Sequence, residues 1–263
     1  MPEGDTLFQA AHRLGRALTG QTLTAVSGAS PRIRSAAGRL QGATVEQVRS
    51  HGKHLVIDTS AGLSVRTHLG MTGGWAVYLA GSRRRFGGSV RIVLQTERAT
   101  AVCTAAPDID VDSTSMIDLA LADLGPDLTG DTFDTGDARR RMAERRQRTV
   151  AELITDQTVM AGAGNVYKSE VLFLVGIHPE TDPAHLTDDD RGRLIDRSRA
   201  LLLLNRDRPR RSTTGNHGRG RELWVYGRVG KPCRRCRHAI ESAWLGDVER
   251  ITYWCPDCQP RAT

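Results

Sequence analysis

The chain has 263 residues and a net charge of +7 at neutral pH. This length suits two domains, each with a core large enough to need no disulfide bonds. The sequence has neither a signal-peptide pattern nor an apolar run of about 18 residues, so we expect a soluble cytoplasmic protein and no membrane partner. The positive charge favours an anionic partner without identifying it.

The first 104 residues indicate one helix followed by β-strands. Apolar residues at helical spacing predict a helix over residues 6–18, with Asp5 placed to cap its first turn. Segments rich in Val, Thr, Ile and Leu then alternate with Gly and Ser turns, which is typical of an antiparallel β unit. Cys103 is expected to be a small buried side chain. The expected strands cover residues 22–26, 44–48, 54–58, 63–68, 89–95 and 100–104.

After Pro107 the pattern becomes helical. Thr187 and Asp190 are spaced as a variant of the capping box, which marks the start of the last helix. We therefore expect an α+β protein with strands in its first half and helices in its second. The expected helices cover residues 115–124, 136–155, 165–175 and 187–204.

Positive charge is concentrated in the last quarter of the chain. Residues 201–263 contain 13 Arg or Lys against 6 Asp or Glu, an excess that equals the net charge of the whole chain. Such a cluster is typical of proteins that bind nucleic acids. A solvated basic surface is the alternative, and charge alone does not decide between them.

Four of the five cysteines form two Cys-x-x-Cys pairs near the end of the chain. Eighteen residues separate the first pair from the second. Two such pairs can close a tetrahedral thiolate site around one structural Zn²⁺, whereas a redox dithiol would not need two copies. Arg250 lies between the pairs, where a metal-pinned turn can present it to a phosphate; a solvated turn arginine is the alternative. The four ligands would be Cys233, Cys236, Cys255 and Cys258.

The N-terminus, Met1-Pro2-Glu3-Gly4, can supply a nucleophile. Because Pro2 is small, Met1 is a candidate for removal, which would leave a secondary amine at the chain end. Part of such an amine is neutral and nucleophilic near neutral pH. Its attack on a sugar C1′ gives an iminium, and Glu3 is placed to move protons to the opening sugar. A frayed chain end is the ordinary alternative.

A glycine-punctuated turn, residues 160–167, leads into the expected helix over residues 165–175. Glycines let the backbone approach a polyanion, and the exposed amides at the start of a helix favour phosphate. A packing joint between two helices is the alternative interpretation.

Together these features resemble the family of formamidopyrimidine-DNA glycosylase and endonuclease VIII, the Fpg/Nei family. The resemblance implies an N-terminal antiparallel β-sandwich-like domain with an N-terminal helix, a helical domain with a helix-two-turns-helix motif, and a C-terminal zinc-finger β-hairpin. The implied domain bounds are 1–110, 111–220 and 221–263. The similar segments are residues 2–4, 51–55, 68–73, 156–179, 225–228 and 253–259.

The resemblance also implies catalytic roles. Pro2 would form a Schiff base with the damaged nucleotide, and Glu3 would be the acid/base beside it. Lys53 is similar to the lysine that assists β-elimination; without the family it would be interpreted as a solvated turn residue. Arg250 is similar to the arginine that binds a phosphate flanking the lesion and supports δ-elimination.

Two further residues are implied to bind DNA. Asn165 matches the family's phosphate-binding asparagine. Met71 matches the residue that enters the base stack when the lesion is flipped out, and a core methionine is the alternative. The implied partner is damaged DNA, bound by a monomer that carries one structural Zn²⁺.

The implied function is a bifunctional DNA glycosylase/AP lyase of base excision repair that cleaves by β,δ-elimination. Only ten residues separate Thr214 from Val225, too few for the loop that closes over an oxidised purine in Fpg proteins. This favours the endonuclease VIII branch and oxidised pyrimidines, although the segment 68–71 is closer to Fpg. Two alternatives stay open: a zinc-dependent protein that binds damaged DNA without cutting it, and a zinc-ribbon subunit of a larger machine.

The sequence departs from the family pattern at two places. Asp5-Thr6 stands where many relatives have Pro-Glu, so a second N-terminal carboxylate is not expected at the usual place. The segment Arg84-Arg85-Phe86-Gly87 is similar to the one by which Fpg proteins read the opposite strand. It precedes the strand expected at residue 89, and we assign it no such role.

Overall fold

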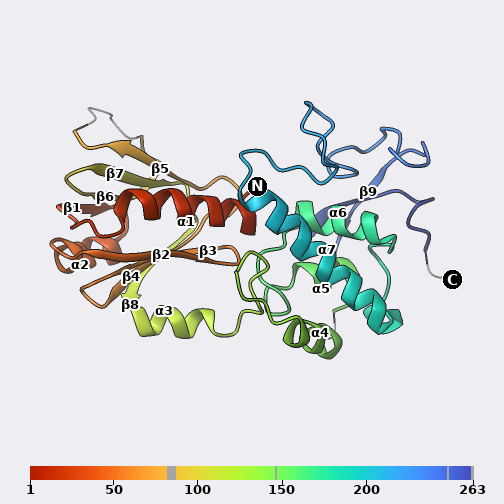
Figure 1. The fold of residues 1–263 in the computed structure, drawn as a ribbon, viewed down its shortest axis with the longest axis horizontal. Helices are drawn as coiled ribbons and strands as arrows, with labels where there is room; N and C mark the ends of the chain where they lie inside the picture. Colours follow the sequence, from red (N-terminus) through yellow and green to blue (C-terminus); the bar gives the residue numbers. More distant parts are fainter. Residues whose placement is uncertain (82–86, 146, 248, 262–263) are drawn as a thin grey trace. The chain divides into compact units, whose positions relative to one another are not determined.

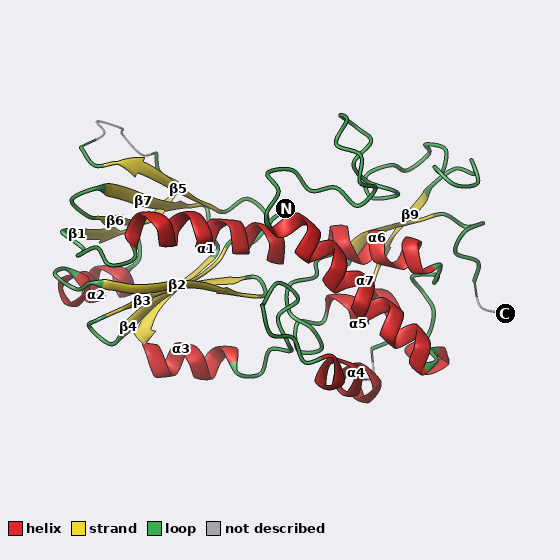
Figure 2. Ribbon diagram, viewed as in Figure 1, coloured by secondary structure: helices red, strands yellow, loops and turns green. Residues whose placement is uncertain are grey.

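The computed structural model describes residues 1–81, 87–145, 147–247 and 249–261 (Figure 1). The chain divides into two compact units, Met1–Asp123 and Leu124–Thr263. Within the described ranges, no helix combines the length and the apolar character needed to cross a membrane. Figure 2 shows most strands in the first unit, beside helices α1 to α3, and helices α4 to α7 in the second, in agreement with the α+β class that the sequence predicts.

Two four-stranded antiparallel sheets form the first unit, and they confirm the predicted sandwich. The first sheet has the order β1-β6-β7-β5, with β1 (Ala25–Gly28), β6 (Val90–Gln95), β7 (Ala99–Thr104) and β5 (Gly74–Leu79). The second has the order β2-β3-β4-β8, with β2 (Val45–His51), β3 (His54–Thr59), β4 (Leu63–His68) and β8 (Asp108–Ser113). The described part of this unit also contains the helices α1 (Gly4–Leu18), α2 (Pro31–Leu40) and α3 (Thr114–Leu121).

Helix α1 supplies one wall of the core between the sheets. Its residues Leu7, Leu14 and Leu18 are buried in one cluster with Ile57 of β3 and Ile92 of β6. Each buried leucine of this kind contributes about 1.5–3 kcal/mol through apolar burial. Cys103 lies in the same cluster and is fully buried, as predicted, and burial raises the pKa of its thiol to about 12.

The predicted cap of α1 is wrong. The helix begins at Gly4, so Glu3 occupies the N-cap position with extended backbone, and no side chain caps the helix there. Asp5 lies inside the first turn, where its carboxylate accepts a hydrogen bond from the N–H of Thr6 at 2.8 Å. The expected cap lies two residues after the observed N-cap, because the apolar periodicity begins only at Leu7.

Helix α6 (Asn165–Val175) is the centre of the second unit, and its residues Asn165–Phe173 are all buried. Around it lie α4 (Thr135–Glu144), α5 (Val150–Thr155) and α7 (Asp188–Arg206), with a short 3-10 helix at Pro183–His185. The predicted capping box of Thr187 and Asp190 is present at the start of α7. One helix was expected over residues 136–155, but a second capping box, Thr149 with Glu152, starts α5 separately.

The second unit ends in an antiparallel hairpin, β9 (Glu241–Leu245) and β10 (Arg250–Trp254), with Arg250 opposite Leu245 and Trp254 opposite Glu241. We call residues 241–254 the hairpin. It lies between the two cysteine pairs, as the sequence predicts.

Candidate active site and metal centre

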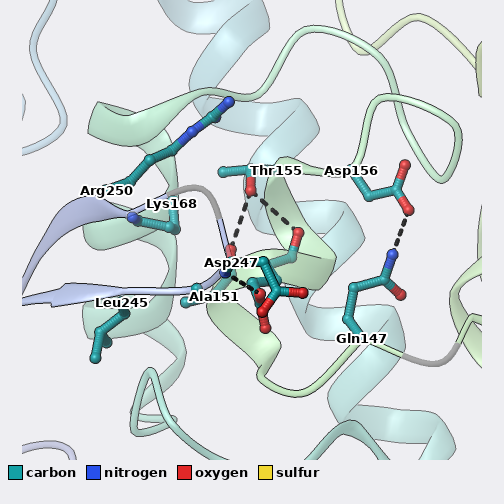
Figure 3. A pocket seen from close by; sticks show the side chains of 10 residues that line it. Gln147, Ala151, Thr155, Asp156, Lys168, Leu245, Asp247 and Arg250 are labelled. Carbon is teal, nitrogen blue, oxygen red and sulfur yellow. Dashed lines mark hydrogen bonds between the residues drawn. The ribbon is translucent and has the colours of Figure 1, made fainter.

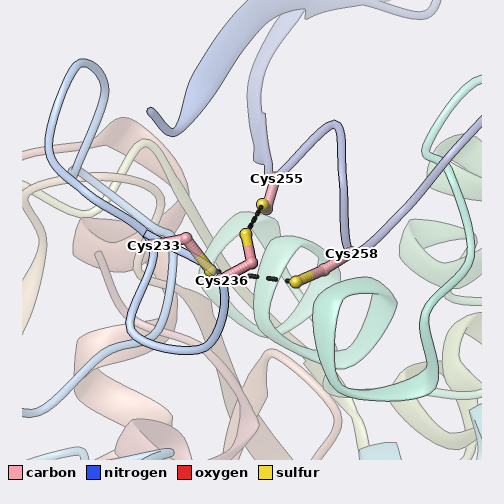
Figure 4. Close-up of side chains that lie close together, drawn as sticks. All are labelled: Cys233, Cys236, Cys255 and Cys258. Atoms are coloured by element: carbon pink, nitrogen blue, oxygen red, sulfur yellow. Dashed lines mark hydrogen bonds between the residues drawn. The ribbon is translucent and has the colours of Figure 1, made fainter. Parts of the chain in front are cut away.

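The four paired cysteines form one cluster (Figure 4). Their sulfur atoms all lie within 4.8 Å of one another, with 3.9 Å between Sγ of Cys233 and Cys258 and 3.4 Å between Sγ of Cys236 and Cys255. A tetrahedral site with Zn–S bonds of about 2.3 Å places its sulfurs about 3.8 Å apart. The residues present therefore fit a four-thiolate metal site, and a single redox pair does not explain why all four converge.

The hairpin is tied to helix α6 by consecutive residues of β10. Asn165 Nδ2 donates to the carbonyl oxygen of Ile251 at 2.8 Å. Lys168 Nζ donates to Oγ1 of Thr252 at 2.6 Å. These bonds fix the start of β10, where Arg250 is exposed, relative to the first turn of α6. In the part of the chain that the structure describes, Asn165 Oδ1 is buried without a hydrogen-bond partner.

A pocket of about 260 Å³ lies beside these contacts (Figure 3). It is lined from the hairpin by Arg250 and Asp247, from α6 by Lys168, and from α5 by Glu152. Lys168 is only 2% exposed, yet sequence analysis did not single it out. Its position three residues after Asn165, on the same helical face, was the available signal.

Pro2 and Glu3 lie at the start of α1, in the first unit. The carbonyl oxygen of Glu3 accepts hydrogen bonds from the N–H groups of Thr6 at 2.8 Å and Leu7 at 3.1 Å. Glu3 is fully buried, whereas Pro2 is partly exposed. The backbone next to Pro2 is thus held by the helix, and this argues against the alternative of a frayed chain end.

Lys53 lies in the tight turn between β2 and β3, where Gly52 adopts the left-handed φ of 56°. The pKa of His68, at the end of β4, is lowered mainly by burial and secondly by the positive charge of Lys53. His54 pairs with His68 across the strands, with ring centroids 5.1 Å apart. The turn that carries Lys53 and the end of β4 therefore lie at the same end of this sheet.

Met71 follows β4 in a loop closed by the N–H of Gly73, which donates to the carbonyl oxygen of Leu69 at 2.8 Å. Leu69 is buried, whereas Met71 is 68% exposed. Gly70 has φ of 58°, and a Cβ there would lie 2.7 Å from the ring of Pro107. The loop thus holds Met71 outward, which rules out the core-methionine alternative.

The structure distributes the predicted residues between its two units. Pro2, Glu3, Lys53 and Met71 belong to the first, and Asn165, Arg250 and the four cysteines to the second. Of the segment 84–87, residues 84–86 lie outside the described residues. Sequence analysis missed Glu170, whose buried carboxylate accepts hydrogen bonds from three consecutive backbone N–H groups, those of Trp224, Val225 and Tyr226.

Two family models match the chain: the formamidopyrimidine-DNA glycosylase N-terminal domain over residues 1–107 and the formamidopyrimidine-DNA glycosylase H2TH domain over residues 124–206. The chain is 43% identical to a protein named probable endonuclease 8 2 of Streptomyces coelicolor, covering 98% of this chain and 94% of that protein. It is 42% identical to the DNA-(apurinic or apyrimidinic site) lyase Nei2 of Mycolicibacterium smegmatis, covering 98% and 99%.

The fold is similar to that of Lactococcus lactis Fpg, solved in complex with DNA that contains an abasic site. The TM-score is 0.85 at 23% identity, and the match covers 98% of this chain and 100% of that chain. At this identity the likeness concerns the fold, and it agrees with the sandwich, the helical domain and the hairpin described above.

Proposed function

The chain belongs to the Fpg/Nei family, and from this premise we propose that it is a bifunctional DNA glycosylase/AP lyase of base excision repair. The observation that carries the proposal is the 42% identity, over 98% of the chain, to a protein named as an AP lyase. Similarity to proteins named endonuclease 8 agrees with the branch predicted from the sequence. A match over the whole chain also disfavours a zinc-ribbon subunit.

In the proposed reaction, Met1 is removed and the α-amine of Pro2 attacks C1′ of the damaged nucleotide. The N-glycosidic bond breaks, the base leaves with a proton, and an iminium joins Pro2 to the opened sugar. Loss of a C2′ proton then expels the 3′ phosphate, and a second elimination expels the 5′ phosphate. Glu3 supplies and accepts protons at the sugar, and Lys53 assists the first elimination.

The DNA is held by residues of both units. Asn165 and Arg250 bind phosphates near the lesion, and Arg250 supports the second elimination by neutralising the departing phosphate. Met71 fills the space that the flipped nucleotide leaves in the stack. The protein acts as a monomer, and oxidised pyrimidines are the proposed substrates.

The metal of the cysteine cluster is Zn²⁺ in this proposal, bound by Cys233, Cys236, Cys255 and Cys258. Four thiolates leave no open coordination position, so the ion is structural and stabilises the segments on either side of the hairpin. Its contribution to catalysis is indirect, through the position of Arg250.

Borohydride trapping tests the central step. The mature protein should form a covalent adduct with DNA that contains an abasic site, and mass spectrometry should place the adduct on Pro2. Pro2→Gly replaces the secondary amine with a primary amine and should lower the adduct yield at least tenfold, whereas its binding to intact duplex should match that of the parent. Absence of an adduct, with lesion binding retained, would favour the binding-only alternative.

The substrate class is tested by a panel of duplexes, each with one defined oxidised base. Single-turnover excision should be faster for oxidised pyrimidines than for oxidised purines. The reverse order would overturn the pyrimidine preference and leave the lyase chemistry intact.

A further inference from the structure

Arg250 stands at the boundary between an anchored strand and a turn. The contacts that tie β10 to helix α6 begin at Ile251 and continue through Thr252, after Arg250 in the chain. Before Arg250 in the chain come Gly246 and Asp247, which open the turn of the hairpin, while residue 248 lies outside the described residues. Since Arg250 is exposed, the direction of its side chain depends on how that turn is held as well as on the strand.

Glu152 of helix α5 holds the turn. Its Oε1 accepts a hydrogen bond from the N–H of Asp247 at 3.0 Å. Its Oε2 accepts from both the N–H and the hydroxyl of Thr149, each at 3.0 Å, which completes the capping box of α5. One carboxylate therefore joins the start of a helix to the turn of the hairpin, and the helix fixes the carboxylate in place.

The turn is shaped to receive this carboxylate. Gly246 has the left-handed φ of 88°, and a Cβ there would lie 2.9 Å from Cγ and 3.0 Å from Oε1 of Glu152. The turn is also bound by an ion pair between Arg148 and Asp247, whose side chains are 80% and 71% exposed. Pairs with such exposure contribute little. Glu152 is therefore the stronger of these two anchors.

We propose that Glu152 is a positioning residue for Arg250, acting through the hairpin turn. This inference rests on the proposed role of Arg250 in the second elimination. Glu152 does not touch DNA in this proposal; it restricts the turn so that the guanidinium of Arg250 meets the departing phosphate. Loss of the contact should leave attack by Pro2 and the first elimination intact and slow the second.

The test measures the ratio of δ-elimination to β-elimination products from abasic-site DNA, under single-turnover conditions with the full zinc-loaded chain. Glu152→Ala should lower this ratio at least threefold, and Arg250→Ala should lower it as well. The double variant should show no further loss beyond Arg250→Ala, because both changes remove the same interaction. The rate at which borohydride traps the Glu152→Ala variant on abasic-site DNA should stay at the parent value.

Thr149→Ala is the matched control: it removes the hydroxyl of the capping box of α5, whereas the backbone N–H groups of Thr149 and Asp247 still donate to the carboxylate of Glu152. It should lower the melting temperature yet keep the parent product ratio. Gly246→Ala tests the same contact from the other side: it keeps Glu152 and displaces the turn, so it should reproduce the loss.

The outcomes separate the two levels of the proposal. If Glu152→Ala or Gly246→Ala keeps the product ratio of the parent while Arg250→Ala lowers it, the positioning role of Glu152 is overturned and the role of Arg250 stands. An equal loss in Thr149→Ala also overturns it, since destabilised α5 would then suffice. A parent ratio in Arg250→Ala overturns the proposed function of that arginine.

Discussion

The carboxylate of Glu170 accepts a hydrogen bond from the backbone N–H of Val225 at 2.8 Å. The same carboxylate accepts from the N–H groups of Trp224 and Tyr226 and from the hydroxyl of Thr213. Glu170 is fully buried in helix α6. The side chain of Glu170 therefore provides the hydrogen-bond acceptors for the backbone N–H groups of residues 224–226, in the segment that leads to the first cysteine pair.

Glu170→Gln should destabilise the protein strongly. The variant replaces one accepting oxygen by an NH₂ group, which is itself a donor and would face backbone N–H groups. Leaving buried N–H groups without an acceptor costs about 1–3 kcal/mol each, so we expect a loss of about 3 kcal/mol in the free energy of unfolding. Urea titration measures this loss, and hydrogen exchange should quicken at residues 224–226. Glu180→Gln, at an exposed ion pair with Arg261, is the control and should change stability by less than about 1 kcal/mol. Equal stability of the two variants would contradict the assignment.

Metal removal should change the reactivity of four cysteines and not that of the fifth. A chelator should expose the clustered thiols to a maleimide at pH 8, whereas Cys103 stays unmodified because burial raises its pKa to about 12. Peptide mass mapping after labelling distinguishes the sites. Labelling of Cys103 at the rate of the other four would show that the first unit does not keep its fold without the metal.

Met71→Ala should weaken DNA binding without weakening the fold. Since Met71 is 68% exposed, the free energy of unfolding should change by less than about 0.5 kcal/mol. Affinity for a lesion-containing duplex should fall about tenfold, because the apolar wedge is lost. Met116→Ala, at a 52% exposed methionine on α3, is the matched control and should keep the parent affinity. If both variants bind equally well, Met71 does not enter the stack.

The sequence predicts an element well when its end signals and apolar spacing lie within the element itself, and poorly when pairing with a distant segment defines it. Helix α6 was predicted with its observed bounds, because a glycine precedes it and Gly176 ends it in the left-handed conformation. Helix α2 was missed although Ser30 caps it and Pro31 opens it, since its apolar residues are few. Strand β8 was missed although Ile109 and Val111 alternate with polar residues, because the aspartates between them are rare in strands; its pairing with β4 places it at a sheet edge.

The candidate site divides in the same way. The cysteine pairs and the N-terminal motif are contiguous in sequence, so the sequence sufficed to name them. The contacts of Glu152 with Asp247 and of Lys168 with Thr252 join residues 95 and 84 positions apart. Neither pair has a recognisable spacing, and it is the packing of the hairpin on α5 and α6 that brings each pair together.

Stability should fall as the pH drops below neutrality, in part because of His54. Burial, together with the charges of His68 and Arg66, lowers the pKa of His54 from its ordinary value of 6.5 to about 4, and its Nδ1 is buried without a hydrogen-bond partner in the described residues. Between pH 6.5 and pH 4, His54 therefore binds a proton in the unfolded chain and stays neutral in the folded protein. The stabilisation is complete above pH 6.5 and is lost as the pH falls toward 4, by about 2 kcal/mol at pH 5.

His54→Phe should remove this part of the pH dependence. Urea titrations at pH 7.5 and pH 5 measure it as the difference in the free energy of unfolding, which should be smaller in the variant than in the parent by about 2 kcal/mol. His12→Gln, at an exposed histidine of α1, should keep the parent difference. An unchanged difference in His54→Phe would show that protonation of His54 does not contribute to the pH dependence of stability.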